Sequence, residues 1–165
     1  MRWNKIGMIG LISMIAVVIT ACTNANNSGD SILPFTSIVP GMSMEEIRKL
    51  EPEMEEEDGW CYLTKDYQGF PMEGEFDQES IDTIIIWTCY DDELDLDQLV
   101  DSLTTYFDKR YEVYTTMEED SFSATDWRTD KYDILLKDSV FRFMGTESRE
   151  ITLSLSVRLD LKDHT

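Results

Sequence analysis

The chain has 165 residues, of which 34 are Asp or Glu and 14 are Lys or Arg, so its formal net charge is −20. Hydrophobic residues make up 42% and aromatic residues 11%. That composition is too apolar for a disordered chain, and the length suits one domain or two small subdomains with a shared core. The negative charge argues against a nucleic-acid-binding protein, because phosphate contacts need cations.

Residues 1–21 have the composition of a secretory signal. Arg2 and Lys5 form a basic start, residues 6–19 are mostly apolar, and the small residues Thr20 and Ala21 precede Cys22. The alternative is an uncleaved membrane helix, but the apolar run is about 14 residues and a spanning helix needs roughly 20. Either interpretation places the rest of the chain outside the cytoplasm.

The tetrad Ile19-Thr20-Ala21-Cys22 resembles the lipobox of bacterial lipoproteins. The resemblance implies cleavage before Cys22 and attachment of lipid, such as palmitate, to its sulfur and its new amino terminus. The protein would then be anchored on the extracytoplasmic side of a bacterial cell membrane, since two or more acyl chains give stable binding. Cleavage removes two basic residues, which leaves 34 acidic and 12 basic residues in the mature chain, or −22.

Residues 22–35 are expected to be a flexible tether, because most of them are small and polar and show no periodicity. The folded domain is expected over residues 36–162. Its first element is a short helix, where Ser43 and Glu46 form a capping box and Pro52 ends the helix.

Three strands are predicted next, after an acidic loop over residues 53–58. They cover residues 60–67, 70–77 and 81–90, and polar residues separate them. A second helix begins with Asp95 and Gln98 and is strongly amphipathic. Its apolar positions are Leu96, Leu99, Val100, Leu103 and Phe107.

The second half of the chain again contains strand-like segments, over residues 111–115, 123–128, 132–137 and 140–144. The last predicted strand, residues 151–161, alternates strictly between apolar and polar side chains. A helix followed by strands occurs twice, which predicts an α+β fold. We expect an antiparallel β-sheet with two helices packed on one face, and the order allows two tandem αβββ repeats over residues 36–91 and 92–162.

An offset of 67 residues superposes Trp60 on Trp127, and Ile84 and Ile86 on Ile151 and Leu153. This offset predicts that Ile84 and Ile86 lie on the buried face of the sheet. Ile85 and Trp87 would then lie on the opposite face, beside Ser154, Ser156 and Arg158. An aromatic anchor on a polar sheet face would suit protein recognition. The alternative is a sheet covered on both sides, with Trp87 in the core.

Residues 35–50 resemble the opening of the SmpA/OmlA (BamE-like) lipoprotein domain and of tandem domains related to β-lactamase inhibitory protein. The matching features are Gly41-Met42-Ser43, the aliphatic Ile47, and Leu50 shortly before Pro52. The resemblance implies a helix on an antiparallel sheet and a role in protein binding. Glu51 stands where many relatives have Gly, and the cysteine pairs of the inhibitory protein have no counterpart.

Chemistry-bearing residues are sparse. The single histidine, His164, lies next to the C-terminus, and the sequence has no G-x-S-x-G motif. Cys61 and Cys89 fall at opposite ends of a three-strand meander, which favours two separate thiols over a disulfide. Zinc is not expected, because no Cys-x-x-Cys or histidine cluster is present. We therefore predict no catalytic residue, no metal ligand and no cofactor.

The acidic run over residues 91–97 raises the question of Ca²⁺ binding. As an EF-hand loop it would put Leu96 where Gly is needed and Ser102 where Glu is needed. Acids gathered near a helix N-terminus explain the run more simply.

The leading prediction is a lipid-anchored, non-catalytic module that binds another protein, with Trp87, Ile85 and Arg158 at the contact and an acidic surface that attracts basic partners. One alternative is a protein that binds Ca²⁺ or small cationic ligands through its carboxylates. Another is an enzyme that acts through carboxylates or through Cys61 and Cys89.

Overall fold

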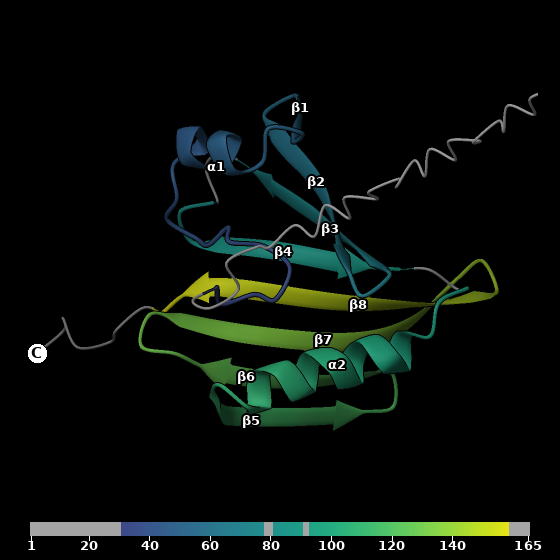
Figure 1. Ribbon diagram of the computed structural model, residues 1–165. Helices are drawn as coiled ribbons and strands as arrows, with labels where there is room; N and C mark the ends of the chain where they lie inside the picture. Colours follow the sequence, from purple (N-terminus) through teal and green to yellow (C-terminus); the bar gives the residue numbers. More distant parts are fainter. Residues whose placement is uncertain (1–30, 78–80, 91–92, 159–165) are drawn as a thin grey trace, which may run out of the picture.

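The computed structural model describes residues 31–77, 81–90 and 93–158. Their framework is an eight-stranded antiparallel sheet with the strand order β1-β2-β3-β4-β8-β7-β6-β5 (Figure 1). Helix α1 (Met44–Leu50) precedes β1, and helix α2 (Leu96–Asp108) follows β4. The strands are β1 (Glu55–Glu57), β2 (Trp60–Tyr67), β3 (Phe70–Asp77), β4 (Ile84–Cys89), β5 (Glu112–Glu119), β6 (Phe122–Arg128), β7 (Tyr132–Phe143) and β8 (Thr146–Val157).

The predicted fold class, a helix-packed α+β fold, is wrong. The sheet dominates, because the helices have only 7 and 13 residues whereas β7 and β8 have 12 each. Polar segments that separated the predicted strands are themselves in strands: Asp138 and Ser139 lie within β7, and residues 116–119 belong to β5. Backbone pairing continues through polar residues wherever their side chains point to solvent.

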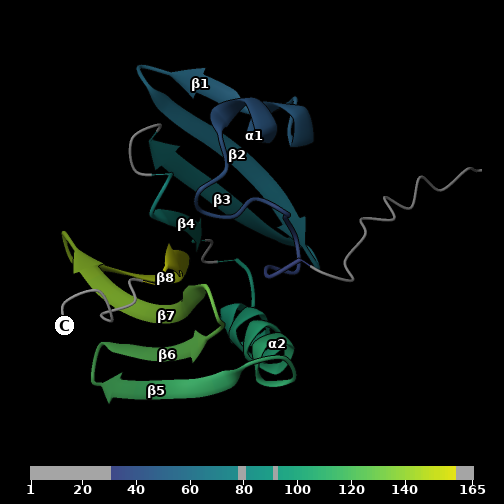
Figure 2. The same cartoon turned by 90° about the vertical axis from the view of Figure 1, so that its left-hand side faces the viewer.

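The chain forms two meanders, β1–β4 and β5–β8, that join through the antiparallel pair β4–β8 at the centre of the sheet. Each half has one helix followed by four strands, not the three strands expected for an αβββ repeat. Both helices and residues 31–43 lie on the same side of the sheet (Figure 2). We call this side the covered face and the opposite side the open face.

The register at β4 overturns the 67-residue offset. Ile85 pairs with Leu155 and Trp87 with Leu153, all on the covered face, whereas Ile86 pairs with Ser154 on the open face. The two tryptophans superposed by the offset also differ, because Trp60 is 42% exposed and Trp127 is fully buried. A shift of one residue moves every side chain of a strand to the other face, so a slightly wrong alignment inverted the prediction.

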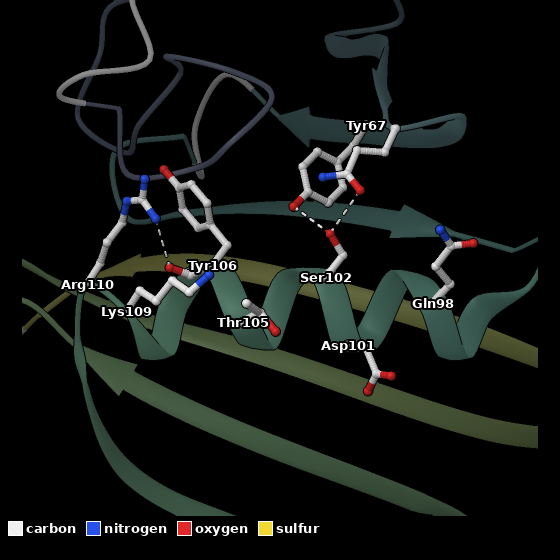
Figure 3. A pocket seen from close by; sticks show the side chains of 9 residues that line it. Tyr67, Gln98, Asp101, Ser102, Thr105, Tyr106, Lys109 and Arg110 are labelled. Carbon is white, nitrogen blue, oxygen red and sulfur yellow. Dashed lines mark hydrogen bonds between the residues drawn. The ribbon is translucent and has the colours of Figure 1, made fainter.

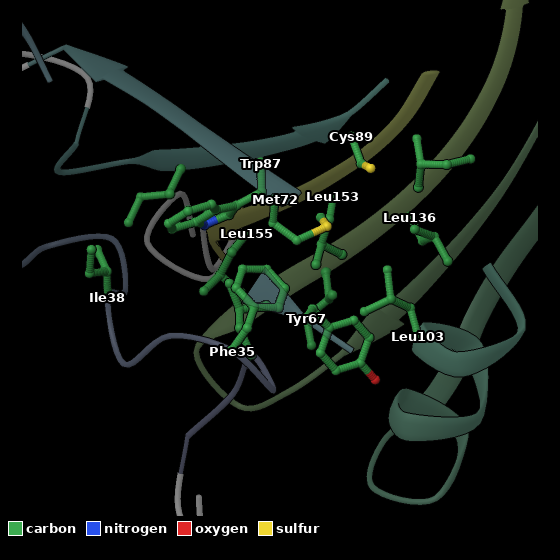
Figure 4. Close-up of a cluster of buried hydrophobic side chains, with 14 of the residues drawn as sticks. Phe35, Ile38, Tyr67, Met72, Trp87, Cys89, Leu103, Leu136, Leu153 and Leu155 are labelled. Atoms are coloured by element: carbon green, nitrogen blue, oxygen red, sulfur yellow. The ribbon is translucent and has the colours of Figure 1, made fainter. Parts of the chain in front are cut away.

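The core lies between the sheet and the elements on its covered face. Figure 4 shows Phe35 and Ile38 of the first described segment and Leu103 of α2 against Trp87, Leu153 and Leu155 of the sheet. Leu33 and Phe35 are buried, so residues 31–35 pack on the domain and do not belong to a free tether. The predicted domain start at residue 36 is therefore too late.

The predicted helix starts are confirmed. Ser43 Oγ accepts a hydrogen bond from the Glu46 amide at 3.3 Å, and the Glu46 carboxylate accepts one from the Ser43 amide at 2.8 Å. Asp95 caps α2 by accepting from the Gln98 amide at 3.3 Å. Leu96, Leu99, Leu103 and Phe107 form the buried stripe of α2.

Polar contacts hold both ends of α2 to the sheet. Near its start, the Arg149 guanidinium of β8 lies 2.7 Å from carboxylate oxygens of both Asp97 and Asp138. At its end, Trp127 Nε1 donates to Asp108 at 2.8 Å. Across the segments that the structure describes, neither helix has the length and apolar character needed to cross a membrane.

Candidate functional site

The predicted contact surface at Trp87 and Ile85 does not exist in the structure. Both side chains are fully buried on the covered face, so the prediction that they bind a partner is wrong. The Trp87 ring packs edge-on against Phe35, with 5.2 Å between ring centroids, and lies 6.5 Å from Phe76. Trp87 belongs to the core, as the alternative has it, but the sheet is covered on one side and not on both.

Arg158 lies apart from those two residues. It is exposed, and its guanidinium donates to the Thr129 carbonyl at 3.2 Å, beside the turn between β6 and β7. Cys22, with the proposed signal and most of the tether, lies outside the described residues, as do His164, Asp91 and Asp92.

Cys61 and Cys89 are both buried and are not joined by a disulfide. Cys61 pairs with Phe76 and Cys89 with Ile151, which places them at opposite ends of the β2–β4 meander. Burial, followed by the nearby Glu56 carboxylate, raises the pKa of the Cys61 thiol. This thiol is therefore a poor nucleophile at neutral pH.

The acidic segment after α1 is partly neutralised by bases on the covered face. Lys65 contacts the carboxylates of Glu51 and Glu53, and Arg48 Nη2 lies 2.8 Å from a Glu56 oxygen. In the described parts of the chain, no three His, Cys, Asp or Glu side chains come together closely enough to hold a metal ion.

A groove of about 450 Å³ runs along α2 beside the turn between β2 and β3 (Figure 3). At one end of the groove, Ser102 Oγ lies 3.0 Å from the Tyr67 hydroxyl and 3.1 Å from Gln68 Oε1. At the other end, Arg110 lies over the Tyr106 ring at 3.8 Å and donates to its carbonyl. The contacts of Ser102 attach α2 to the end of β2 and to the turn that follows it.

The open face carries large apolar side chains in contact with solvent. Their exposed fractions lie between 38% and 59%. They form two groups, one in each half of the sheet, and serine and threonine side chains of β4 and β8 lie between the groups. The exposed apolar residues are Trp60, Tyr62, Ile86 and Tyr90 in the first half and Tyr114, Met117 and Phe141 in the second.

A depression of about 310 Å³ lies on the open face of β2, β3 and β4. Tyr62 pairs with Glu75, and Glu73 pairs with Thr64 on one side and Thr88 on the other. Together with Tyr90 these side chains line the depression, which we call the aromatic–acidic groove: Tyr62, Thr64, Glu73, Glu75, Thr88 and Tyr90.

The electrostatics of the groove are anionic. The hydrogen bond between Tyr90 and Glu73 raises the pKa of the Tyr90 hydroxyl, and the charges of Glu73 and Glu150 raise it further. Burial raises the pKa of Tyr62, and the carboxylates of Glu75 and Glu57 add to the effect. Both phenols therefore stay protonated and face carboxylates.

Sequence reasoning missed this groove, although strand alternation contained the signal. Met72 and Phe76 are buried, so Glu73 and Glu75 between them must face the other way. In β2 the buried Cys61 and Leu63 alternate with the outward Trp60 and Tyr62, but all four are apolar, so the sequence alone does not say which pair is buried. The pattern identified an outward face, but only the pairing of β2, β3 and β4 brought its members together.

Comparison of the chain with protein-family models, with curated proteins and with solved structures gave no match.

Proposed function

We propose that this protein is a non-catalytic module that binds another protein through the open face of its sheet, and that lipid on Cys22 holds it at the outer side of a bacterial membrane. The module presents a binding surface and carries out no reaction. The lipid anchor is supported by the lipobox-like tetrad before Cys22 and by the basic and apolar segments that precede it.

The observation that carries the proposal is the contrast between the two faces. Helices and residues 31–43 cover one face, whereas seven large apolar side chains of the described residues are exposed on the other. Large apolar side chains gathered on one solvent-facing side of a sheet suit a recognition site, because a few aromatic side chains supply most of the binding energy at protein interfaces.

The size of the open face also suits a protein partner. Eight strands about 4.8 Å apart extend over roughly 34 Å, and strands of six to eight residues add about 20–27 Å in the other direction. This matches the ~800 Å² that one partner contributes to a standard interface. The aromatic–acidic groove is shallow and lies within this surface.

Site-specific photocrosslinking in native cells tests the proposal. A photoreactive residue at Phe141 or Ile86 on the open face should give adducts with one discrete protein. The matched control is Thr105, which is also exposed but lies on α2 on the covered side. Adducts from Thr105 alone, or no protein adduct from either open-face position, would overturn the proposal.

The anchor is tested separately by fatty-acid labelling and by mass spectrometry of the mature N-terminus. Cys22→Ser should abolish incorporation of the labelled acyl chain and release the protein from the membrane fraction. Labelling that persists in Cys22→Ser would show that the lipid is attached elsewhere.

A further inference from the structure

The two halves of the open face differ in charge. In the half formed by β1–β4, every charged side chain that the described register directs outward is acidic. In the half formed by β5–β8, Arg128 and Lys137 stand among the acids. The outward acids of the first half are Glu55, Glu57, Asp66, Glu73, Glu75 and Asp77.

The bases of the first half are engaged elsewhere. Lys65 points to the covered face and contacts Glu51 and Glu53, and Arg48 of α1 pairs with Glu56. Among the salt bridges within the described residues, none includes Glu73 or Glu75. The carboxylates of the aromatic–acidic groove therefore face solvent without a cation from the described chain.

In the second half of the open face, one of the protein's own cations lies beside both an aromatic ring and a carboxylate. The Arg128 guanidinium lies 2.9 Å from the centroid of the Tyr114 ring, and its Nε donates to Asp133 at 3.1 Å. A cation is thus held between an aromatic face and a carboxylate. Both interactions favour a positively charged group.

The first half has the same two components, an aromatic ring and a carboxylate, and no cation of the described segments lies between them. Tyr62 and Tyr90 supply aromatic rings, and Glu73 and Glu75 supply carboxylates on the same side of β3, about 7 Å apart along the strand. Exposed Trp60 and Ile86 extend the apolar surface beyond the groove. A ligand that carries its charge on an apolar stem and continues along the sheet fits these features better than a bare ion.

We propose that the aromatic–acidic groove binds a lysine or arginine side chain from an exposed basic segment of the partner protein. This inference rests on the proposed function and names the chemistry of the partner. The cationic head lies between Glu73 and Glu75, and its methylene stem packs against Tyr62 and Tyr90. Charge complementarity with a chain of net charge −20 also speeds the encounter with a basic partner.

Binding of a short synthetic peptide in which lysine and serine alternate tests the proposal. The full-length protein is used in detergent, with fluorescence anisotropy as the readout. Glu73→Gln with Glu75→Gln should weaken binding by about tenfold, because both carboxylates that contact the cationic head lose their charge. The matched control is Glu112→Gln with Glu119→Gln, which changes the net charge equally on the open face of β5 and should change the affinity by less than about twofold.

Equal weakening by the two pairs of substitutions would show attraction by overall charge alone and would overturn the proposal. Loss of the aromatic rings gives a second readout. Tyr62→Leu with Tyr90→Leu keeps the surface apolar and should weaken binding about two- to tenfold. Unchanged affinity in that variant would contradict a role for the rings, and thermal melting checks that each variant is folded.

Competition separates the possible cations. Spermidine, and Ca²⁺ at millimolar concentration, are tested as competitors of the peptide. If either binds as tightly as the peptide, the occupant is a small cation and the proposal is contradicted.

Photocrosslinking from Phe141 is then repeated in the Glu73→Gln, Glu75→Gln background, where the yield of the partner adduct should fall by the same factor as the affinity for the peptide. An undiminished adduct refutes this inference and leaves the proposed function intact, whereas absence of any adduct from wild-type positions refutes the proposed function itself.

Discussion

Ile86 and Trp87 are neighbours in β4, yet they belong to opposite faces of the sheet and serve different purposes. Trp87 is fully buried between Phe35 and Phe76, whereas Ile86 is 38% exposed beside Ser154 of β8. The covered face holds the fold together, and the open face is available to a partner. The following substitutions break or sharpen this contrast, from the largest expected effect to the smallest.

The largest effect is expected at the centre of the covered face. Trp87→Ala should lower the free energy of unfolding by about 3–5 kcal/mol, because it removes a large buried ring and leaves a cavity at the junction of the two meanders. Ile86→Ala, one residue away, should cost less than about 1 kcal/mol. Urea unfolding followed by circular dichroism measures both values, and similar losses in the two variants would contradict the assignment of faces.

A methyl group added at Gly74, against the Trp87 ring, should lower the free energy of unfolding by an intermediate amount. A Cβ atom at Gly74 would lie 2.7 Å from Cζ3 of Trp87 and 2.9 Å from Cε3, so Gly74→Ala forces the ring to move. Overpacking of this kind costs about 1–3 kcal/mol.

A double-mutant cycle checks that the cost arises at Trp87. Trp87→Leu supplies a smaller side chain, so Gly74→Ala should be much less harmful in that background than in the wild type. Strictly additive losses would show that the steric contact does not determine the requirement for glycine.

The smallest effect is expected on the open face of β6, and it depends on pH. Burial, and then the Asp133 carboxylate, raise the pKa of Asp126, and its Oδ1 atom has no hydrogen-bond partner among the residues that the structure describes. The folded state therefore binds a proton more tightly than the unfolded state, so the ionised carboxylate destabilises the fold at neutral pH. The native protein gains stability from this group as the pH falls toward about 3.9, the ordinary pKa of Asp.

Asp126→Asn removes the ionisable group. The variant should melt at a higher temperature than the wild type near pH 7, by an amount worth less than about 1 kcal/mol, and this advantage should shrink as the pH falls. Thermal melts at several pH values measure it. If the advantage of Asp126→Asn over the wild type grew as the pH fell, the pKa of Asp126 would be lowered in the folded state and not raised.

Local features of the fold were predictable wherever a short segment contains its own physical reason. The capping box at Ser43 and the cap at Asp95 depend on residues three positions apart, and both are present. The buried stripe of α2 and the alternation of Ile151, Leu153 and Leu155 were also correct. The overall balance of helix and sheet was not, because continued pairing through polar positions of β7 extends strands beyond their apolar segments.

The site was predicted on the wrong side of the sheet for a specific reason. The β4 strand begins with Ile84, Ile85, Ile86 and Trp87, four apolar residues in succession, so its own alternation does not say which set is buried. Pairing with β8 decides the matter, because Leu153 and Leu155 lie opposite Trp87 and Ile85. In β3, by contrast, polar and apolar residues alternate from Met72 onward, and the outward positions of Glu73 and Glu75 could have been read from the chain.

The amino-acid order alone established the acidic character, the lipobox-like tetrad at Cys22, the helix starts and the alternation of most strands, since these depend on composition or on near neighbours. The tertiary structure decided which face each β4 residue occupies, which face the helices cover, and that Tyr62, Glu75 and Tyr90 meet in one groove. Those outcomes depend on pairing between strands that are distant in the sequence. The physical reason is that hydrogen-bond register, set by contacts across the whole sheet, determines which face a side chain occupies.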